Sequence, residues 1–289
     1  SEVFRMGEEG YFTFRIPAII LGSDGKTLLA FAEARKNNRS DTGDIDLVLK
    51  RSEDGGRTWG KMIKVWNDVE NVCGNPAPVV DRRSGKIILL ATWNLGTDHE
   101  QDILRNRASD TRRVFVLNSS DNGNTWSEAQ EITTSVKSPG WTWYATGPCH
   151  AIQLMKGKHK GRIVVPCDHA YLKDTLPVYR SHLIYSDDGG RHWKLGGISA
   201  DDGNESTVAE LNDGRLLLNM RTSGESRKQQ KCRLLALSAD GGASVAETRP
   251  EPQLTEPVCQ GSMLPFDTGK ASESILLFSN PNATDKRRD

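Results

Sequence analysis

The chain has 289 residues, with 38 basic and 38 acidic side chains and a hydrophobic fraction of 36%. This balance excludes a global field that would recruit nucleic acid or an acidic membrane surface, so an anionic ligand would have to be bound by a local cluster of cations. No apolar run reaches 18 residues, and the five cysteines lack the spacing of a metal site. The sequence therefore predicts no membrane-spanning helix, no metal site and no cofactor.

Pairs of short apolar runs, usually joined by a glycine turn, recur along the whole chain. Each pair has the length and residue types of a β-hairpin. The pairs occupy residues 18–31, 77–90, 151–165, 207–218 and 263–278.

An octet of turn residues is interleaved with these hairpins. Ser52–Trp59 recurs at intervals of 67 residues as Ser119–Trp126 and Ser186–Trp193, and a weaker copy begins at Ser238. In such an octet Asp accepts hydrogen bonds from its own turn, Gly supplies a positive φ, and Trp fills the space between sheets. A further strand is predicted before and after each octet. We therefore interpret the octets as structural turns between the third and fourth strands of repeated units.

The two repeats together define the fold class. Each unit of roughly 55–75 residues holds four short strands, and no stretch has a sustained helical period. Four-stranded antiparallel units repeated around an axis are typical of a β-propeller. The sequence predicts one all-β propeller domain over residues 1–289, with five first hairpins but only four outer strand pairs.

Several charged residues fall at one end of the predicted units. The start of the first strand and the end of the second lie at the same end of an antiparallel unit. Arg15 precedes a first strand, Arg35 ends its partner, and Asp41 lies on the next loop. In the fourth unit Glu205 precedes the first strand and Arg221 ends the second. We expect these groups to meet at one face, with the octets at the opposite end.

The segment Phe14-Arg-Ile-Pro17 resembles the F-R-I-P motif of sialidases, and the octets resemble their Asp boxes. Asp boxes also occur in unrelated propellers, so the first motif decides the resemblance. Further similarity lies at Phe31–Arg35, Asn75–Pro78, Gly147–His150, Val164–Pro166, Asn204–Ser206, Asn219–Arg221, Cys259–Ser262 and Phe278–Pro281. The resemblance implies a six-bladed propeller, of which this chain lacks the last blade, and hydrolysis of α-ketosidically linked sialic acid.

The resemblance also implies an arginine triad that binds the sialic acid carboxylate. It maps onto Arg15, Arg221 and one of Arg287 and Arg288, which are expected to end the second strand of the fifth unit; we prefer Arg287. Planar guanidinium groups pair with carboxylates through two hydrogen bonds, which a lysine cannot do. Arg35 would contact the sugar or orient its loop, with an ion pair to Glu33 as the alternative.

Two carboxyl groups resemble the family's catalytic acids. Asp41 matches the acid/base aspartate, which protonates the departing oxygen, although Asp44 and Asp46 are nearby alternatives. Glu205 matches the glutamate that takes the proton from a tyrosine nucleophile, with Glu210 as the alternative.

Aromatic residues supply the remaining binding candidates. Trp141, Trp143 and Tyr171 fall where the family lines its N-acyl and glycerol pockets, although core packing is the competing interpretation. Gln260 is a weaker binding candidate.

The nucleophile has no match among the tyrosines of this chain. The family places it after the third arginine, whereas the tyrosines here end at Tyr185. We therefore expect the nucleophile beyond these residues. The expected partners are sialylated glycans, glycoproteins or gangliosides. A non-catalytic sialoglycan-binding propeller and a trans-sialidase are the alternatives. A secreted, periplasmic or cell-surface location is expected, with lysosomal and cytoplasmic locations left open.

Overall fold

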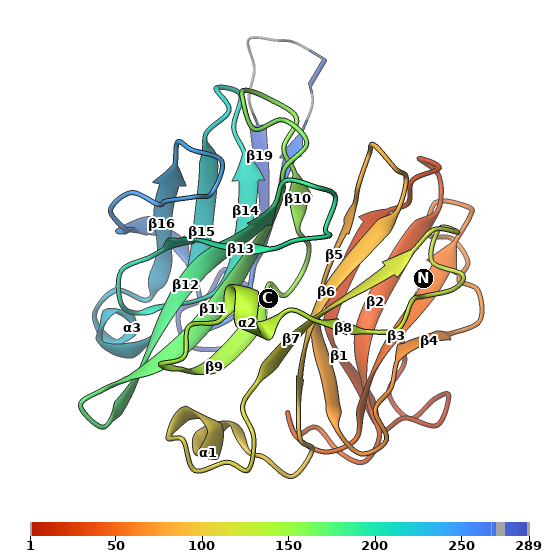
Figure 1. The fold of residues 1–289 in the computed structure, drawn as a ribbon, viewed down its shortest axis with the longest axis horizontal. Helices are drawn as coiled ribbons and strands as arrows, with labels where there is room; N and C mark the ends of the chain where they lie inside the picture. The colour runs from red at the N-terminus through yellow and green to blue at the C-terminus, as the bar shows by residue number, and fades with distance from the viewer. Residues whose placement is uncertain (1, 267, 270–274, 288–289) are drawn as a thin grey trace.

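The computed structural model describes residues 2–266, 268–269 and 275–287, which are almost entirely β (Figure 1). The described residues form four units of antiparallel strands, followed by one further hairpin. Within each unit, strands that follow one another in the chain are hydrogen-bonded neighbours, except for β9 and β10, which both pair with β11. The predicted all-β units are therefore confirmed, whereas the total of six blades stays a prediction.

The first two units are linked into one sheet. Ile45 of β3 (Ile45–Ser52) pairs in parallel with Val72 of β5 (Val72–Val80). The other strands of these units are β1 (Thr13–Leu21), β2 (Leu28–Arg35), β4 (Ile63–Trp66), β6 (Ile87–Asn94), β7 (Arg113–Ser119) and β8 (Gln130–Glu131).

The third unit has a divided first strand. Both β9 (Trp141–Thr146) and β10 (Ile152–Gln153) pair with β11 (Ile163–Lys173), and residues 147–151 leave the sheet between them. The sequence predicted the start of this strand at Ala151 and did not indicate β9. The reason is that Gly147 and Pro148 interrupt the apolar run. The later strands are β12 (Leu176–Ser186), β13 (Lys194–Ile198), β14 (Gly203–Glu210), β15 (Leu216–Thr222), β16 (Cys232–Ser238), β17 (Arg249–Thr255), β18 (Ser262–Phe266) and β19 (Ile275–Ser279).

The units follow one another around a common centre. Their first strands pack together in chain order, with β1 on β5, β5 on β9 and β10, β10 on β14, and β14 on β18. Three short helices lie in connecting segments. They are α1 (Glu100–Leu104), α2 (Thr133–Val136) and α3 (Gly224–Gln230). This radial order is that of a β-propeller.

The hydrophobic cores lie between neighbouring units. Leu29 and Phe31 of the first unit share a buried cluster with Ile87 and Leu89 of the second. A second cluster joins units two and three, and a third joins units three and four. Each unit therefore needs its neighbour to bury an apolar face.

The octets have the predicted turn geometry. In the second copy, Asp121 accepts hydrogen bonds from the backbone N–H and the hydroxyl of Thr125, and Gly123 N–H donates to Ser119. Gly123 has a φ of 86°, and a Cβ there would lie 2.5 Å from Leu29, so only glycine fits. Trp126 packs edge-on against Phe31 of the preceding unit. The octets thus connect adjacent units, as predicted.

No helix within the described residues is long and apolar enough to cross a membrane. The described part of the chain also contains no group of three or more His, Cys, Asp or Glu residues arranged to hold a metal.

Candidate active site

One pocket of about 1050 Å³ lies where the first strands of the units converge. No residue of the four octets lines it, as predicted. The pocket brings together most of the predicted site residues, namely Arg15, Arg35, Asp41, Trp143, Glu205, Arg221, Gln260 and Arg287.

A repeated break in the first strands positions these side chains. Ile16 has a φ of 54°, and Asn75, which also precedes a proline, has a φ of 55°. A β-branched residue at positive φ is rare and strained, so the surrounding packing must hold it there. The strand register shifts at this point in three units, between Arg15 and Ala18, between Gly74 and Ala77, and between Gly203 and Ser206.

This break corrects one detail of the sequence analysis. Arg15 and Glu205 lie inside β1 and β14, at the bulge, and do not precede the strands as expected. The difference arises because the ladder resumes after each bulge. The bulge takes residues out of the regular alternation, which is how bulges re-aim side chains next to active sites.

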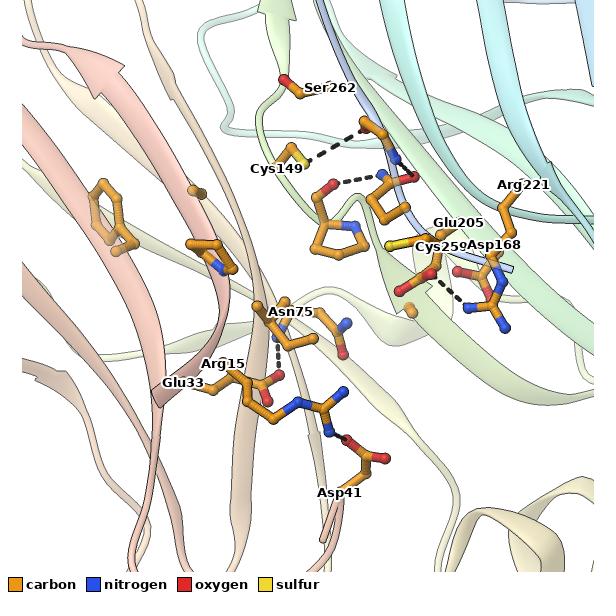
Figure 2. A pocket seen from close by; sticks show the side chains of 18 of the residues that line it. Arg15, Glu33, Asp41, Asn75, Cys149, Asp168, Glu205, Arg221, Cys259 and Ser262 are labelled. Carbon is orange, nitrogen blue, oxygen red and sulfur yellow. Dashed lines mark hydrogen bonds and ion pairs between the residues drawn. The ribbon is translucent and has the colours of Figure 1, made fainter. Parts of the chain in front are cut away.

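Two arginines hold the Asp41 carboxylate. Its Oδ1 lies 2.9 Å from Nη1 of Arg15 (Figure 2). The same oxygen lies 2.6 Å from Nη2 of Arg35. Arg35 is buried and also pairs with Glu33 at 2.6 Å, whereas the Asp41 side chain is 57% exposed. Arg35 further donates to two backbone carbonyls of the loop that carries Asp41. Arg35 therefore both pairs with Glu33 and orients that loop, while Asp41 faces the open pocket.

A second ion pair stands on the other side of the pocket. Nη1 of Arg221, at the end of β15, donates to Oε2 of Glu205 at 2.6 Å (Figure 2). The Nε of Arg221 is buried, and no described residue forms a hydrogen bond with it. Burial opposes the charge of Arg221, but the charges of Glu205, Asp168 and Glu256 and the hydrogen bond to Glu205 together raise the Arg221 pKa. The alternative, Glu210, instead accepts hydrogen bonds from backbone N–H groups at Met155 and Lys156.

The chain is similar to known proteins over most of its length. Residues 26–289 match the model of the BNR repeat-like domain. Mouse Sialidase-2 is 31% identical over 99% of this chain and 76% of its own length. The chain belongs to the sialidase family. A Bacteroides fragilis sialidase is 30% identical over 97% of the chain. The solved structure of the Hadza microbial sialidase Hz136 superposes with a TM-score of 0.86 at 29% identity. This match covers 99% of this chain and 57% of that one.

This sialidase chain spans only part of several relatives. It covers 52% of the Bacteroides fragilis protein, 65% of an Aspergillus fumigatus exo-alpha-sialidase and 43% of a Micromonospora viridifaciens sialidase. Membership of the sialidase family therefore applies to the propeller described here.

The residue predicted as the third arginine of the triad, Arg287, lies elsewhere than expected. Arg287 lines the pocket, but it follows β19 by eight residues and does not end that strand. Its Nε and Nη2 donate to the carbonyl of Val258, at 3.0 and 2.6 Å. The difference arises because an irregular segment, 280–287, separates Arg287 from the strand. Arg288, the alternative, lies outside the described residues.

The three aromatic candidates separate into two places. Trp143 lines the pocket, with the Arg112 guanidinium 4.0 Å from its ring centroid. Trp141 instead stacks on His169 and packs against the core between units two and three. Tyr171 donates to Asp201 at 2.9 Å and does not line the pocket. Of the three, only Trp143 is therefore placed to contact a ligand in this pocket.

Gln260 lines the pocket through a side chain that is already hydrogen-bonded. Its Nε2 donates to the carbonyls of Pro148 and Ser206, and its Oε1 accepts from the backbone N–H of Gly261. These bonds fix the segment before β18 against the third and fourth units.

The pocket is also lined by Glu100, Arg112 and Asp168, which the sequence did not indicate as site residues. Arg112 is buried, and it donates to Asn75 at 2.6 Å and to Thr92 at 2.9 Å. Burial lowers its pKa. Glu100, on α1, accepts a 2.6 Å hydrogen bond from Tyr179. A charged residue inside the apolar run 163–170 was the one signal that could have indicated Asp168.

Proposed function

We propose that this protein is an exo-α-sialidase, which hydrolyses terminal α-ketosidically linked sialic acid from glycans. The observation that carries the proposal is the pair of arginines on two sides of one pocket, each in contact with a carboxylate (Figure 2). Family membership supports the same assignment, since relatives over most of this chain are named sialidases.

The arginines would bind the sugar carboxylate. Arg15 and Arg221 reach the pocket from the first and fourth units, and Arg287 adds a third guanidinium. Guanidinium groups are weakly hydrated and form paired hydrogen bonds with a carboxylate, so they favour this anion over a neutral sugar. In the free protein, Asp41 and Glu205 occupy part of this hydrogen-bonding capacity.

The two carboxylates would divide the chemistry. We assign Asp41 as the acid that protonates the leaving oxygen and later activates water, because it is exposed in the pocket beside Arg15. We assign Glu205 as the base that accepts a proton from a phenol nucleophile. A neutral phenol suits this role because it is not repelled by the substrate carboxylate.

We place the phenol outside the tyrosines of this chain. Among the described residues that line the pocket, one is a tyrosine, Tyr179. Its hydroxyl donates a hydrogen bond to Glu100. Burial first, and then the Glu100 charge, raise the Tyr179 pKa well above the usual tyrosine value, so ionisation of this phenol is opposed. We therefore assign Tyr179 a role in substrate binding.

The test uses two measurements. Calorimetry should detect binding of sialyllactose to the 289-residue chain. Lactose, which lacks the sialic acid, is the control ligand and should not bind. The Arg221→Ala variant should no longer bind sialyllactose. The protein as encoded by its gene should release free sialic acid from sialyllactose. The Tyr179→Phe variant should do so too, because Tyr179 is not the proposed nucleophile. Binding without release by the encoded protein would favour the non-catalytic alternative. Absence of binding would overturn the arginine assignment.

A further inference from the structure

Asp168 is a buried carboxyl group on the wall of the pocket. It lies on β11 and is 1% exposed, yet it is among the residues that line the cavity. Its Oδ1 is buried and has no hydrogen-bond partner among the residues that the structure describes. A buried polar atom without a partner is costly, so it is a candidate for contact with a ligand.

Charged groups from several units surround this carboxyl. Figure 2 shows it next to the Arg221 guanidinium, on the same side of the pocket as Glu205. Arg112 and Glu100 also act on it electrostatically. Burial, and then the Glu205 charge, raise the Asp168 pKa well above its usual value, against the opposing effect of the two arginines. Both causes favour the neutral form of the Asp168 carboxyl group.

A neutral Asp168 would leave the pocket with excess positive charge. Five arginines and five carboxyl groups line it within the described residues, so a neutral Asp168 leaves one arginine uncompensated. The ten residues are Arg15, Arg35, Arg112, Arg221, Arg287, Glu33, Asp41, Glu100, Asp168 and Glu205. An ionised Asp168 would instead repel the carboxylate of an incoming sugar.

We propose that Asp168 contacts the bound sugar, with its carboxyl group donating a hydrogen bond to an oxygen of the ligand beside Arg221. A neutral carboxylic acid can donate where a carboxylate can only accept, and apolar burial is a known way to keep such an acid neutral. This inference rests on the proposed function, because it takes the ligand to be a sialic acid held by the arginines. It assigns Asp168 to substrate positioning.

The experiment measures sialyllactose binding to the 289-residue chain by calorimetry. Asp168→Asn keeps a neutral donor of the same shape, so its affinity should stay within about threefold of wild type. Asp168→Ala removes the donor and should weaken binding about tenfold, the usual value of one hydrogen bond. The matched control is Asp174→Asn, on the exposed turn between β11 and β12, which should bind like wild type.

A purely structural role is separated by two further readouts. Thermal unfolding of each variant shows whether lost affinity follows lost stability. The affinity of wild type should also fall once the pH is high enough to ionise Asp168, and Asp168→Asn should lack that step. Equal affinity of wild type and Asp168→Ala would overturn the Asp168 contact alone. Failure of wild type to bind at all would overturn the proposed function, and this inference with it.

Discussion

Oε2 of Glu205 lies 2.6 Å from Nη1 of Arg221, so the proposed base and one of the proposed carboxylate-binding groups touch before any ligand arrives. The substrate carboxylate must share Arg221 with Glu205, and the geometry of the guanidinium therefore matters as much as its charge. A lysine could replace the charge alone.

Arg221→Lys tests this point. Losing the paired hydrogen bonds while keeping the positive charge should cost about 1.5–3 kcal/mol of transition-state binding. The value of kcat/KM for a fluorogenic sialoside, measured on the protein as encoded, should fall roughly ten- to a hundredfold. Arg215→Lys is the matched control, because Arg215 is exposed on the same β14–β15 hairpin and pairs with the exposed Asp213. A loss below twofold for Arg221→Lys would contradict the role.

The second prediction concerns the octets. Asp121 accepts hydrogen bonds from Ser119 and Thr125, so Asp121→Ala should lower the free energy of unfolding by about 1–2 kcal/mol. Urea unfolding measures this free energy. The control is Glu128→Ala, because Glu128 is an exposed acid just after the octet, and its removal should change the free energy of unfolding little. Sialyllactose affinity should be unchanged in both. An affinity loss without a stability loss would contradict the structural interpretation of the octets.

The same octet has a pH signature. The Thr125 hydroxyl and backbone N–H lower the Asp121 pKa to about 2. A folded-state pKa below the ordinary value means that this stabilisation is complete above pH ~4 and disappears as the pH falls toward 2. Asp121→Ala should therefore differ most from wild type at neutral pH, and the two should converge in strong acid. A difference that stays constant across this range would argue against the hydrogen-bonded carboxylate.

The third prediction concerns two buried histidines. Nδ1 of His169 lies 3.0 Å from Nδ1 of His182, and both side chains are buried. Burial lowers the pKa of His169 to about 3 and that of His182 well below its usual value. The unfolded chain binds protons below pH ~6.5 and the folded chain does not, so stability should fall on acidification by up to about 1.4 kcal/mol per pH unit for each histidine.

Urea unfolding between pH 7.5 and pH 5 checks this slope. The double variant His169→Gln/His182→Gln should flatten it, although its stability at pH 7.5 should also fall because the Trp141 stacking on His169 is lost. His99→Gln, at an exposed position, should keep the wild-type slope. An unchanged slope in the double variant would show that the pair is not the source of the acid sensitivity.

The sequence predicted the features that depend on local repeats. Ser52–Trp59 and its copies were interpretable because their hydrogen bonds close within eight residues. The convergence of Arg15 and Arg221 also followed, because antiparallel pairing fixes which strand ends lie together. The resemblance to sialidases supplied the roles, which strand pairing alone does not contain.

The missed features depend on packing between units. Asp168 becomes a buried pocket residue only because groups from the second and fourth units surround it. Trp141 was predicted to line the pocket because of its position in the sequence. It lies on β9, which is separate from β10, and the Trp141 ring stacks on His169 in the core. Arg287 could not be placed because an irregular segment follows β19. No local pattern encodes such contacts.

The last prediction separates acid catalysis from activation of the nucleophile. A nitrophenolate leaving group barely needs a proton, whereas a sugar alkoxide does. Asp41→Ala should therefore reduce hydrolysis of sialyllactose far more than hydrolysis of a nitrophenyl sialoside, in the protein as encoded. Glu205→Ala should impair both substrates to a similar degree, because the phenol loses its proton acceptor in either case.

The comparison of two substrates also distinguishes these roles from loss of binding. Asp41 contacts Arg15 and Glu205 contacts Arg221, so removing either carboxylate frees an arginine and should not raise KM through lost positive charge. The effect should therefore appear mainly in kcat. Asp44→Ala, on the same loop as Asp41, is the matched control and the alternative acid. Equal losses on both substrates for Asp41→Ala would remove Asp41 from the acid role, and a substrate-dependent loss in Asp44→Ala would transfer that role to Asp44.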